Sequence, residues 1–326
     1  MLYKDRLSDY DEAAFMGPKK LISIGIPCYN EELNVVPAYE ALSSIVKQFS
    51  NYSFEFIFAD NGSEDKTREM IRRVVKRDKR VHGIFLSRNF GPESSGEATM
   101  DFAKGDAFIY YECDMQDPVN IIPKFIKKWE EGFDVVVGVR TKIEDNFIMT
   151  MFRKSFYRVF KAISNIDVPV NAGSFSLIGK RPLEALRSLP ERYRFHRGLR
   201  AWVGFKRAYI TYERKRRIRG RSSYNLLEYF HHAERSFFGF SYMPLDFIVY
   251  LGLILVILSA AFFLLYLIYY FFYDHTHTVS PTVIIVGTII FFGGVQLLAL
   301  SFVGKYVQVI VEETKARPTY IVEEKI

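Results

Sequence analysis

Two long stretches without charged residues constrain this chain more than any other feature. From Phe247 to Tyr273 there is no Asp, Glu, Lys or Arg, and after Asp274 none occurs again until Lys305. About 20 helical residues cover a hydrocarbon core of ~30 Å, so each stretch is long enough to cross a bilayer. Buried helices of soluble proteins seldom lack charge all round. The sequence therefore predicts two transmembrane helices, at 245–273 and 282–306.

The distribution of positive charge predicts how these spans are oriented. Residues 274–281 contain no Lys or Arg, whereas Lys305, Lys315 and Arg317 follow the second span. Basic residues also crowd the approach to the first span: Arg214, Lys215, Arg216, Arg217, Arg219 and Arg221. By the positive-inside rule, we expect the N-terminal head, both termini and the tail 307–326 in the cytoplasm, with 274–281 as an external loop of a multi-pass inner-membrane protein.

The N-terminal segment, the segment before the first span and the two cysteines further restrict the class of protein. Residues 1–20 form a charged extension without the apolar region of a signal peptide. Residues 223–244 mix aromatic and charged residues in a pattern typical of an amphipathic segment at the membrane interface. The two cysteines lack CxxC spacing, which fits a reducing compartment and a place in the core, and argues against structural zinc.

The head, 21–222, alternates β-rich runs with helical patterns. We expect strands at 21–26, 54–59, 81–86, 107–112 and 134–139, with helices near 32–49, 65–77, 93–103 and 120–131. This alternation predicts a doubly wound α/β fold, with a mostly parallel sheet covered on both faces. Ligands bind beyond the carboxyl ends of such strands.

Polar residues follow the expected strands at that edge. Glu112 and Asp114, with Gln116 beyond, supply hard oxygen ligands that suit Mg²⁺ or Mn²⁺. A spaced acidic pair alone is equally typical of a solvated surface turn. The chain has no GxGxxG after a strand and no GxxxxGK[ST], so a dinucleotide fold or a P-loop is not supported.

A set of motifs follows one another along the chain, at 23–32, 59–67, 86–91, 112–118, 136–140, 195–198, 202–205, 217–224 and the tail 304–320. In this order they resemble the motifs of family-2 inverting glycosyltransferases, and more narrowly those of the polyprenyl-phosphate group that includes bactoprenol glucosyltransferases and dolichol-phosphate mannosyltransferases. The resemblance implies a glycosyltransferase A-type fold and transfer with inversion. The donor is expected to be a nucleotide-sugar, UDP-linked, such as UDP-glucose, and the acceptor undecaprenyl phosphate or a similar lipid, for cell-envelope glycosylation.

The resemblance also implies roles for individual residues. The nucleotide would be bound by Pro27, Tyr29, Glu31, Asp60, Asn61, Arg88 and Cys113. The metal would be held by Glu112, Asp114 and Gln116, the acceptor phosphate by Arg140, Arg153 and Ser222, and the sugar and acceptor side would include Asn171 and Ser174. Asp114, Arg140 and Arg217 are the expected catalytic residues. Arg214, Lys215 and Arg216 serve equally well as topology signals.

Two alternatives stay open. A processive polysaccharide synthase would share the nucleotide motifs, although the chain lacks a Gln-x-x-Arg-Trp motif and two spans are few for a channel. A catalytically silent scaffold is suggested by Glu112, Asn61, Asn171 and Ser174, which stand where the family commonly has Asp. The basic charge lies beside the membrane, so no nucleic-acid partner is expected, and we expect a homo-oligomer.

Overall fold

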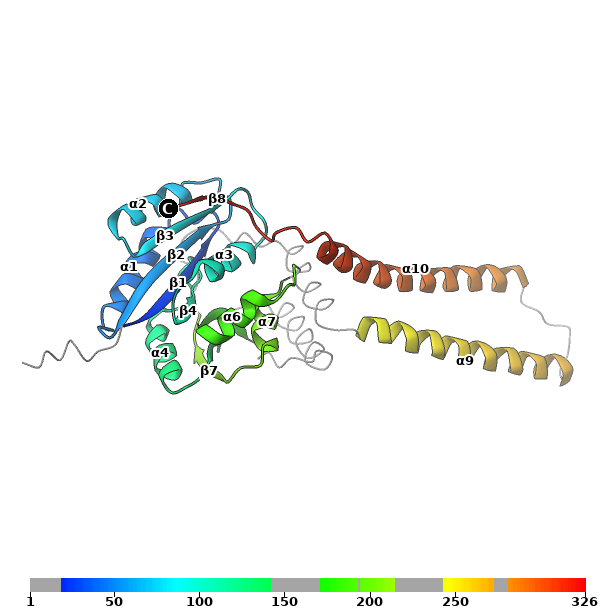
Figure 1. Cartoon of the computed structure of the whole chain (residues 1–326). Helices are drawn as coiled ribbons and strands as arrows, with labels where there is room; N and C mark the ends of the chain where they lie inside the picture. Colours follow the sequence, from blue (N-terminus) through cyan, green and yellow to red (C-terminus); the bar gives the residue numbers. More distant parts are fainter. Residues whose placement is uncertain (1–18, 142–170, 193, 215–242, 273–280) are drawn as a thin grey trace, which may run out of the picture.

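The strands of the head form one continuous sheet (Figure 1). The computed structural model describes residues 19–141, 171–192, 194–214, 243–272 and 281–326. Its strands are β1 (Lys20–Cys28), β2 (Tyr52–Asp60), β3 (Val81–Leu86), β4 (Ala107–Tyr110), β5 (Val135–Arg140), β6 (Ala172–Gly179), β7 (Arg207–Tyr212) and β8 (Val322–Lys325). Within these residues they pair as one eight-stranded sheet in the order β7-β5-β6-β4-β1-β2-β3-β8.

The central strands confirm the expected parallel arrangement. Strand β1 pairs in parallel with β2 and β4, and β2 with β3. Strand β6 runs antiparallel to both β4 and β5, and β5 is parallel to β7. The expected strand at 107–112 ends at Tyr110, because the chain leaves the sheet there to form the turn that carries Glu112 and Asp114.

Helices cover both faces of the sheet, as the sequence predicts. One face is covered by α1 (Val35–Val46), α2 (Thr67–Arg77), the 3-10 turn η2 (Val119–Ile121) and α4 (Ile122–Glu130). The other is covered by α3 (Ser94–Phe102), α6 (Lys180–Ser188) and α7 (His196–Trp202). The sheet residues are buried between these layers, so nearly continuous apolar strands such as β4 are stable there.

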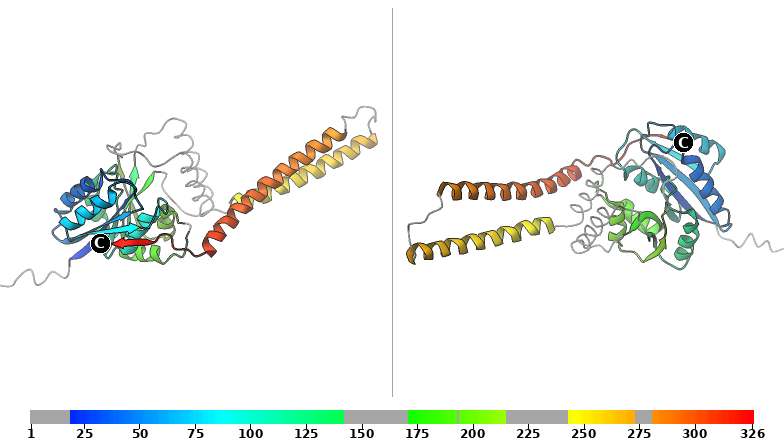
Figure 2. Two further views of the ribbon diagram at one scale, coloured as in Figure 1. Left: turned by 90° about the horizontal axis from the view of Figure 1, so that it is seen from above. Right: turned by 180° about the vertical axis from the view of Figure 1, so that it is seen from behind.

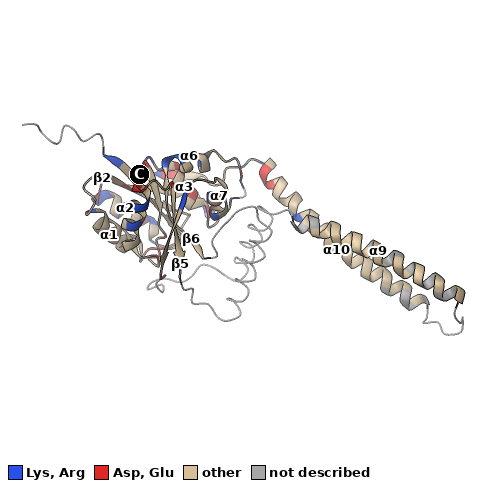
Figure 3. Cartoon of the chain, turned by 90° about the horizontal axis from the view of Figure 1, so that it is seen from below, with Lys and Arg blue, Asp and Glu red and all other residues tan. Residues whose placement is uncertain are grey.

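Two long helices extend from the head (Figures 1 and 2). They are α9 (Met243–Phe272) and α10 (Pro281–Thr314), and they lie side by side. Figure 3 shows that the charged residues gather on the head and at the end of α10 nearest to it, while most of both helices carries none. Within the described residues, the helical stretch Thr288–Thr314 is long enough and apolar enough to cross a membrane, with a mean hydropathy of 1.6. The first span, 245–273, coincides with α9 and stays a prediction.

The tail 307–326 takes part in the fold in a way that the sequence does not suggest. Strand β8 pairs antiparallel with β3 and becomes the last strand of the sheet. Glu324 accepts from Arg72 at 2.6 Å, and Glu323 from Arg68 at 2.8 Å. The chain therefore returns from α10 to cover the edge of β3, which would otherwise expose unpaired backbone groups.

Removal of residues 321–326 should destabilise the head more than any single charge change in the tail. The truncation removes the backbone pairing with β3 and the Ile326 side chain packed beside Gly83. Glu324→Gln removes only a solvent-exposed ion pair, which contributes little. Thermal unfolding and limited proteolysis of the purified full-length protein, the truncation and Glu324→Gln would measure this. Equal behaviour of the truncation and the wild type would show that β8 is not a structural strand.

Candidate active site

The topology gathers the polar ends of six strands at one edge of the sheet. Strands β1 to β4 are parallel, and two antiparallel steps through β6 return β5 and β7 to the same direction. The residues that follow β4, β5 and β7 therefore meet there, together with the residues that begin β6. This is the edge at which doubly wound sheets bind their ligands.

The centre of this edge is a cluster of three carboxylates and two guanidinium groups. Arg214 Nη2 lies 2.9 Å from Glu112 Oε2 and 3.5 Å from Asp114 Oδ2, and its Nε lies 3.6 Å from Asp117 Oδ1. Arg140 Nη2 lies 3.7 Å from Glu112 and 3.8 Å from Asp117. We call these five residues the carboxylate–arginine cluster.

Burial, repulsion between neighbouring carboxylates and contact with arginines give the three carboxyl groups different pKa values. Burial and the neighbouring Glu112 raise the pKa of Asp114 to about 7, and the same two causes raise the pKa of Asp117. Burial also opposes the ionisation of Glu112, but Arg140 and Arg214 hold its pKa below the usual range. The cluster therefore favours an additional cation or a proton near neutral pH.

Several polar atoms of the cluster are buried without a hydrogen-bond partner among the described residues. They are Asp117 Oδ2, Arg140 Nη2 and Arg214 Nε. Asp117 is fully buried, and its other oxygen accepts a hydrogen bond of 2.6 Å from the Tyr212 hydroxyl. Buried polar groups left unpaired are costly, so this cluster is a candidate for completion by a ligand.

The donor set fits a hard divalent cation. Glu112, Asp114 and Gln116 offer oxygen ligands, which Mg²⁺ and Mn²⁺ prefer. Met115, between two of them, has a φ of 57°, and such strained backbone is often found at functional sites. Among the described residues, no group of three or more His, Cys, Asp or Glu is already arranged to hold a metal ion, and Arg214 lies against both acidic ligands.

The loops after β1 and β2, which carry most of the expected nucleotide-binding residues, are joined by side-chain hydrogen bonds. Asn30 N–H donates to Ser63 Oγ at 2.8 Å, and Glu31 N–H donates to Thr67 Oγ1 at 2.8 Å. Asn30 has a φ of 54°, and its side-chain oxygen accepts from the Glu64 N–H at 3.0 Å. Pro27, near the end of β1, and Tyr29, in the loop that follows it, are partly exposed.

Asp60, at the end of β2, is held by the protein itself. It is fully buried and accepts from Arg68 Nε at 2.8 Å and from the Ser63 N–H at 3.2 Å. Arg68 also donates to the Leu86 carbonyl at 2.6 Å and to Glu323 of the tail. The position of Asp60 thus depends on α2 and on the C-terminal strand, and its contact with a nucleobase stays a prediction.

Asn61 fixes the loop that follows β3. Its amide nitrogen donates to Asn89 Oδ1 at 3.1 Å and to the Gly91 carbonyl at 2.7 Å, while its Oδ1 accepts from the Phe90 N–H at 3.1 Å. Asn61 is 2% exposed, so its side chain organises the loop from inside. Asp in this place would lose both donated hydrogen bonds.

The same loop carries Arg88 and packs closely on the chain after β2. A Cβ at Gly62 would lie 2.4 Å from the Arg88 carbonyl carbon, and Gly62 has a φ of 71°. Only glycine allows this approach without strain. Arg88 is exposed, stacks 4.1 Å from the Phe90 ring centroid and donates to the Asn89 carbonyl. The guanidinium group is accessible to a ligand at this edge.

The beginning of β6 brings the remaining predicted residues to the cluster. The Asn171 carbonyl accepts from the Arg140 N–H at 3.1 Å, and Ser174 donates a side-chain hydrogen bond that stabilises ionised Glu112. The Arg200 guanidinium stabilises this strand by hydrogen bonds to the carbonyls of Gly173 and Ser174 and to Ser176 Oγ. Burial and Arg197 lower the pKa of Arg200 to about 10.

Several expected site residues lie elsewhere or beyond the described residues. Arg153, Arg217, Ser222 and most of the amphipathic segment 223–244 are outside the part of the chain that the structure describes. Cys113 and Cys28 are free thiols buried in the core. This agrees with the expectation from the sequence that both cysteines lie in the core. Sequence reasoning missed Asp117, Tyr212 and Arg200, and it did not assign Arg214 to the site.

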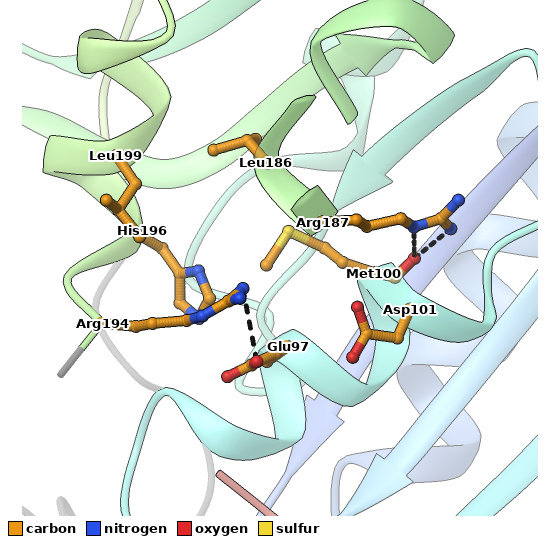
Figure 4. Close-up of a pocket in the computed structure, with 8 residues that line it drawn as sticks. All are labelled: Glu97, Met100, Asp101, Leu186, Arg187, Arg194, His196 and Leu199. Atoms are coloured by element: carbon orange, nitrogen blue, oxygen red, sulfur yellow. Dashed lines mark hydrogen bonds and ion pairs between the residues drawn. The ribbon is translucent and has the colours of Figure 1, made fainter. Parts of the chain in front are cut away.

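A separate pocket lies between α3, α6 and α7 (Figure 4). Glu97, 5% exposed, forms an ion pair with Arg194 at 3.3 Å beside His196. Burial raises the pKa of Glu97 against the effect of these two neighbours. Tyr320 of the tail donates to Asp101 of α3 at 2.7 Å, so this region joins the head to the chain leaving α10.

Comparison with known proteins gives consistent matches. The profile of the family described as glycosyl transferase family 2 matches residues 23–187. A protein of Synechocystis described as an uncharacterized glycosyltransferase is 34% identical over 93% of this chain and 95% of its own. A bactoprenol glucosyl transferase of Shigella phage SfX is 30% identical over 93% of this chain and 99% of its own. The crystal structure of mannosyl-3-phosphoglycerate synthase from Rubrobacter xylanophilus is 12% identical, with a TM-score of 0.47 over 66% of this chain and 71% of that one.

Proposed function

The chain belongs to glycosyl transferase family 2, and on that premise we propose that it transfers a sugar from a nucleoside diphosphate to the phosphate of a polyprenol. The donor is a UDP-sugar such as UDP-glucose, the acceptor is undecaprenyl phosphate, and the configuration at the sugar is inverted. The product is a lipid-linked sugar that later steps of cell-envelope glycosylation use as their donor.

The proposal of a lipid acceptor, rather than another acceptor used within the family, rests on one observation. Similarity to the bactoprenol glucosyl transferase extends over 93% of the chain, beyond the 23–187 match and therefore into the C-terminal helices. The relative's name identifies a lipid acceptor. An apolar helix that continues from the head would hold the carboxylate–arginine cluster near such a lipid.

The arrangement of the head supports a nucleotide donor at the edge of the sheet. The loops after β1, β2 and β3 are fixed to one another by Ser63, Thr67 and Asn61. They lie at the same edge of the sheet as the cluster, because β1, β2, β3 and β4 are parallel. The base and ribose would lie against Pro27, Tyr29, Glu31 and Asp60, with Arg88 facing the phosphates.

The reaction requires neutralisation of charge more than proton transfer. A lipid phosphate is already an anion at neutral pH, so no general base is needed. The anion attacks the anomeric carbon from the face opposite the departing diphosphate, through an oxocarbenium-like state. Arg140 is 11% exposed and lies at the cluster, where its guanidinium group can hold an incoming phosphate oxygen. The sequence resemblance assigns Arg153 and Ser222, which lie outside the described residues, to the same acceptor phosphate.

A divalent cation fits the same proposal. Mg²⁺ or Mn²⁺ bound by Glu112, Asp114 and Gln116 would act as a Lewis acid that stabilises the negative charge of the leaving diphosphate. Asp117 and Tyr212 hold the arginine side of the cluster in place through their hydrogen bond of 2.6 Å. Glu112 is one methylene longer than the usual Asp and retains the same ligating group.

The membrane arrangement follows from the positive-inside rule. We place α9 and α10 across the inner membrane, the head and both termini in the cytoplasm, and 274–281 outside. In α9, Phe262, Phe271 and Phe272 are 69%, 75% and 78% exposed, which suits an apolar environment. Association of several copies within the membrane is part of the same proposal.

The test is a transfer assay with the purified full-length protein in detergent. The protein is incubated with undecaprenyl phosphate, Mg²⁺ or Mn²⁺, and a panel of radiolabelled UDP- and GDP-sugars. We expect label from one UDP-sugar in the lipid phase and none with undecaprenol, which lacks the phosphate. Label in a growing polymer would favour a processive synthase. Retained nucleotide binding with no transfer from any donor would favour a silent scaffold.

A further inference from the structure

Arg214 lies where it competes with a cation for the acidic ligands. It follows β7 by two residues, and its side chain reaches Glu112, Asp114 and Asp117 at 2.9, 3.5 and 3.6 Å. Two of these residues are the proposed metal ligands. The guanidinium group therefore contacts the same carboxylate oxygens that a divalent cation would bind.

The contacts of Arg214 neutralise charge without satisfying all of its hydrogen-bonding groups. Its Nη2 donates to Glu112 at 2.9 Å, but its buried Nε has no hydrogen-bond partner among the described residues. Asp117 Oδ2, on the other side of the cluster, likewise has no hydrogen-bond partner among the described residues, although Arg140 Nη2 lies 3.8 Å away. A buried ion pair with incomplete hydrogen bonding contributes little net stability, because its attraction barely offsets desolvation. Arg214, whose side chain is 25% exposed, can therefore be exchanged at little net cost for another cation that takes over the neutralisation of Glu112 and Asp114.

We propose that Arg214 is an internal counter-ion that occupies the cation position of the metal-free protein and yields it to Mg²⁺ or Mn²⁺. The proposal rests on the metal role of Glu112 and Asp114 given above. A divalent cation bound by Glu112 and Asp114 at about 2 Å would lie between the two oxygens that Arg214 Nη2 contacts at 2.9 and 3.5 Å, so the two groups need the same place. Binding of the cation and the contact of Arg214 with Glu112 therefore exclude one another.

This exchange has a consequence for the order of binding. Without a ligand, Arg214 screens the repulsion between Glu112 and Asp114 and lowers the affinity of the pair for a free cation. A nucleoside diphosphate brings negative charge that can accept a displaced guanidinium group through paired hydrogen bonds. The cation therefore binds weakly alone and tightly together with the donor. Arg214 is a positioning residue in this scheme.

The proposal is tested by Mn²⁺ binding in the absence of nucleotide, sugar and lipid. Free Mn²⁺ is measured by electron paramagnetic resonance with the full-length protein in detergent. We expect Arg214→Gln to bind Mn²⁺ about tenfold more tightly than the wild type, as the loss of a close competing charge implies. Arg214→Lys, which keeps the charge, should lie within about twofold of the wild type. Arg181→Gln removes a positive charge from an exposed position of α6 and should leave the affinity unchanged.

Each other outcome contradicts the proposal. Equal Mn²⁺ affinity in the wild type and Arg214→Gln, or no binding by either, would show that Arg214 and the cation do not compete. A similar gain in Arg214→Lys would show that the effect does not come from charge. Arg214→Met replaces Arg214→Gln if the latter does not fold. Failure of lipid transfer would overturn the proposed function without changing this result, since the assay contains neither sugar nor lipid.

Discussion

Asp114→Asn is expected to lower sugar transfer by roughly a thousandfold or more while the protein stays folded, because the change removes one charged oxygen ligand at the point where the leaving diphosphate gains charge. Asp114 lies beside Glu112 in a partly buried cluster, and the two carboxylates repel each other. A neutral amide removes that repulsion. The unfolding temperature of the variant should therefore equal or exceed that of the wild type.

The measurement compares initial rates of label transfer at saturating donor and acceptor. Glu184→Gln is the matched control, since it removes one carboxylate from an exposed position of α6. The control should transfer sugar at the wild-type rate. Undiminished transfer by Asp114→Asn would remove Asp114 from the reaction, and an equal loss in both variants would point to a general effect of charge.

Asn61→Asp is expected to destabilise the head by about 2–4 kcal/mol, because a buried carboxylate would replace an amide that donates two hydrogen bonds. The Asn61 nitrogen donates to Asn89 Oδ1 and to the Gly91 carbonyl, at 3.1 and 2.7 Å. In the variant, an oxygen would face these two acceptors. For a head of this size the loss corresponds to a fall of roughly 5–10 °C in unfolding temperature.

The control uses the other partner in the same contact. Asn89 is exposed, and its Oδ1 is the atom that accepts from Asn61 and from the Gly91 N–H. Asn89→Asp retains an acceptor in that place and should change the unfolding temperature little. Both variants are heated at one fixed rate in the same detergent, since unfolding of such proteins is often irreversible. A similar shift in the two variants would show that the donated hydrogen bonds of Asn61 are not the cause.

The prediction of the fold depended on features that are local in sequence. Alternating apolar strands and amphipathic helices predict the doubly wound sheet, and the structure confirms it from β1 to β5 with helices on both faces. These signals are strong because a buried strand or a half-buried helix must repeat its apolar residues at a fixed period. The two long apolar helices were predicted for a different reason, the length of each run without charged residues.

The strand at the C-terminus could not be predicted in this way. The residues Val322, Glu323, Glu324 and Lys325 have no apolar alternation, and their pairing depends on an uncovered edge of β3 and on Arg68 and Arg72 of α2. More than two hundred residues separate these partners in sequence. Only the return of the chain from α10 brings them together.

The candidate site shows the same division. The sequence by itself determined where the carboxylates lie, because residues such as Asp114 that follow a buried strand must lie at the edge of a parallel sheet, while their role as metal ligands stays a prediction. It could not assign Arg214, which begins a basic run that serves equally well as a topology signal, or Arg200, which carries no periodic signal. Tertiary structure decided which carboxylates each arginine contacts, because the antiparallel passage of β6 places the end of β7 beside the turn after β4. The local sequence pattern determines the secondary structure and which polar residues follow each strand, whereas ion pairs between distant segments depend on the path of the whole chain.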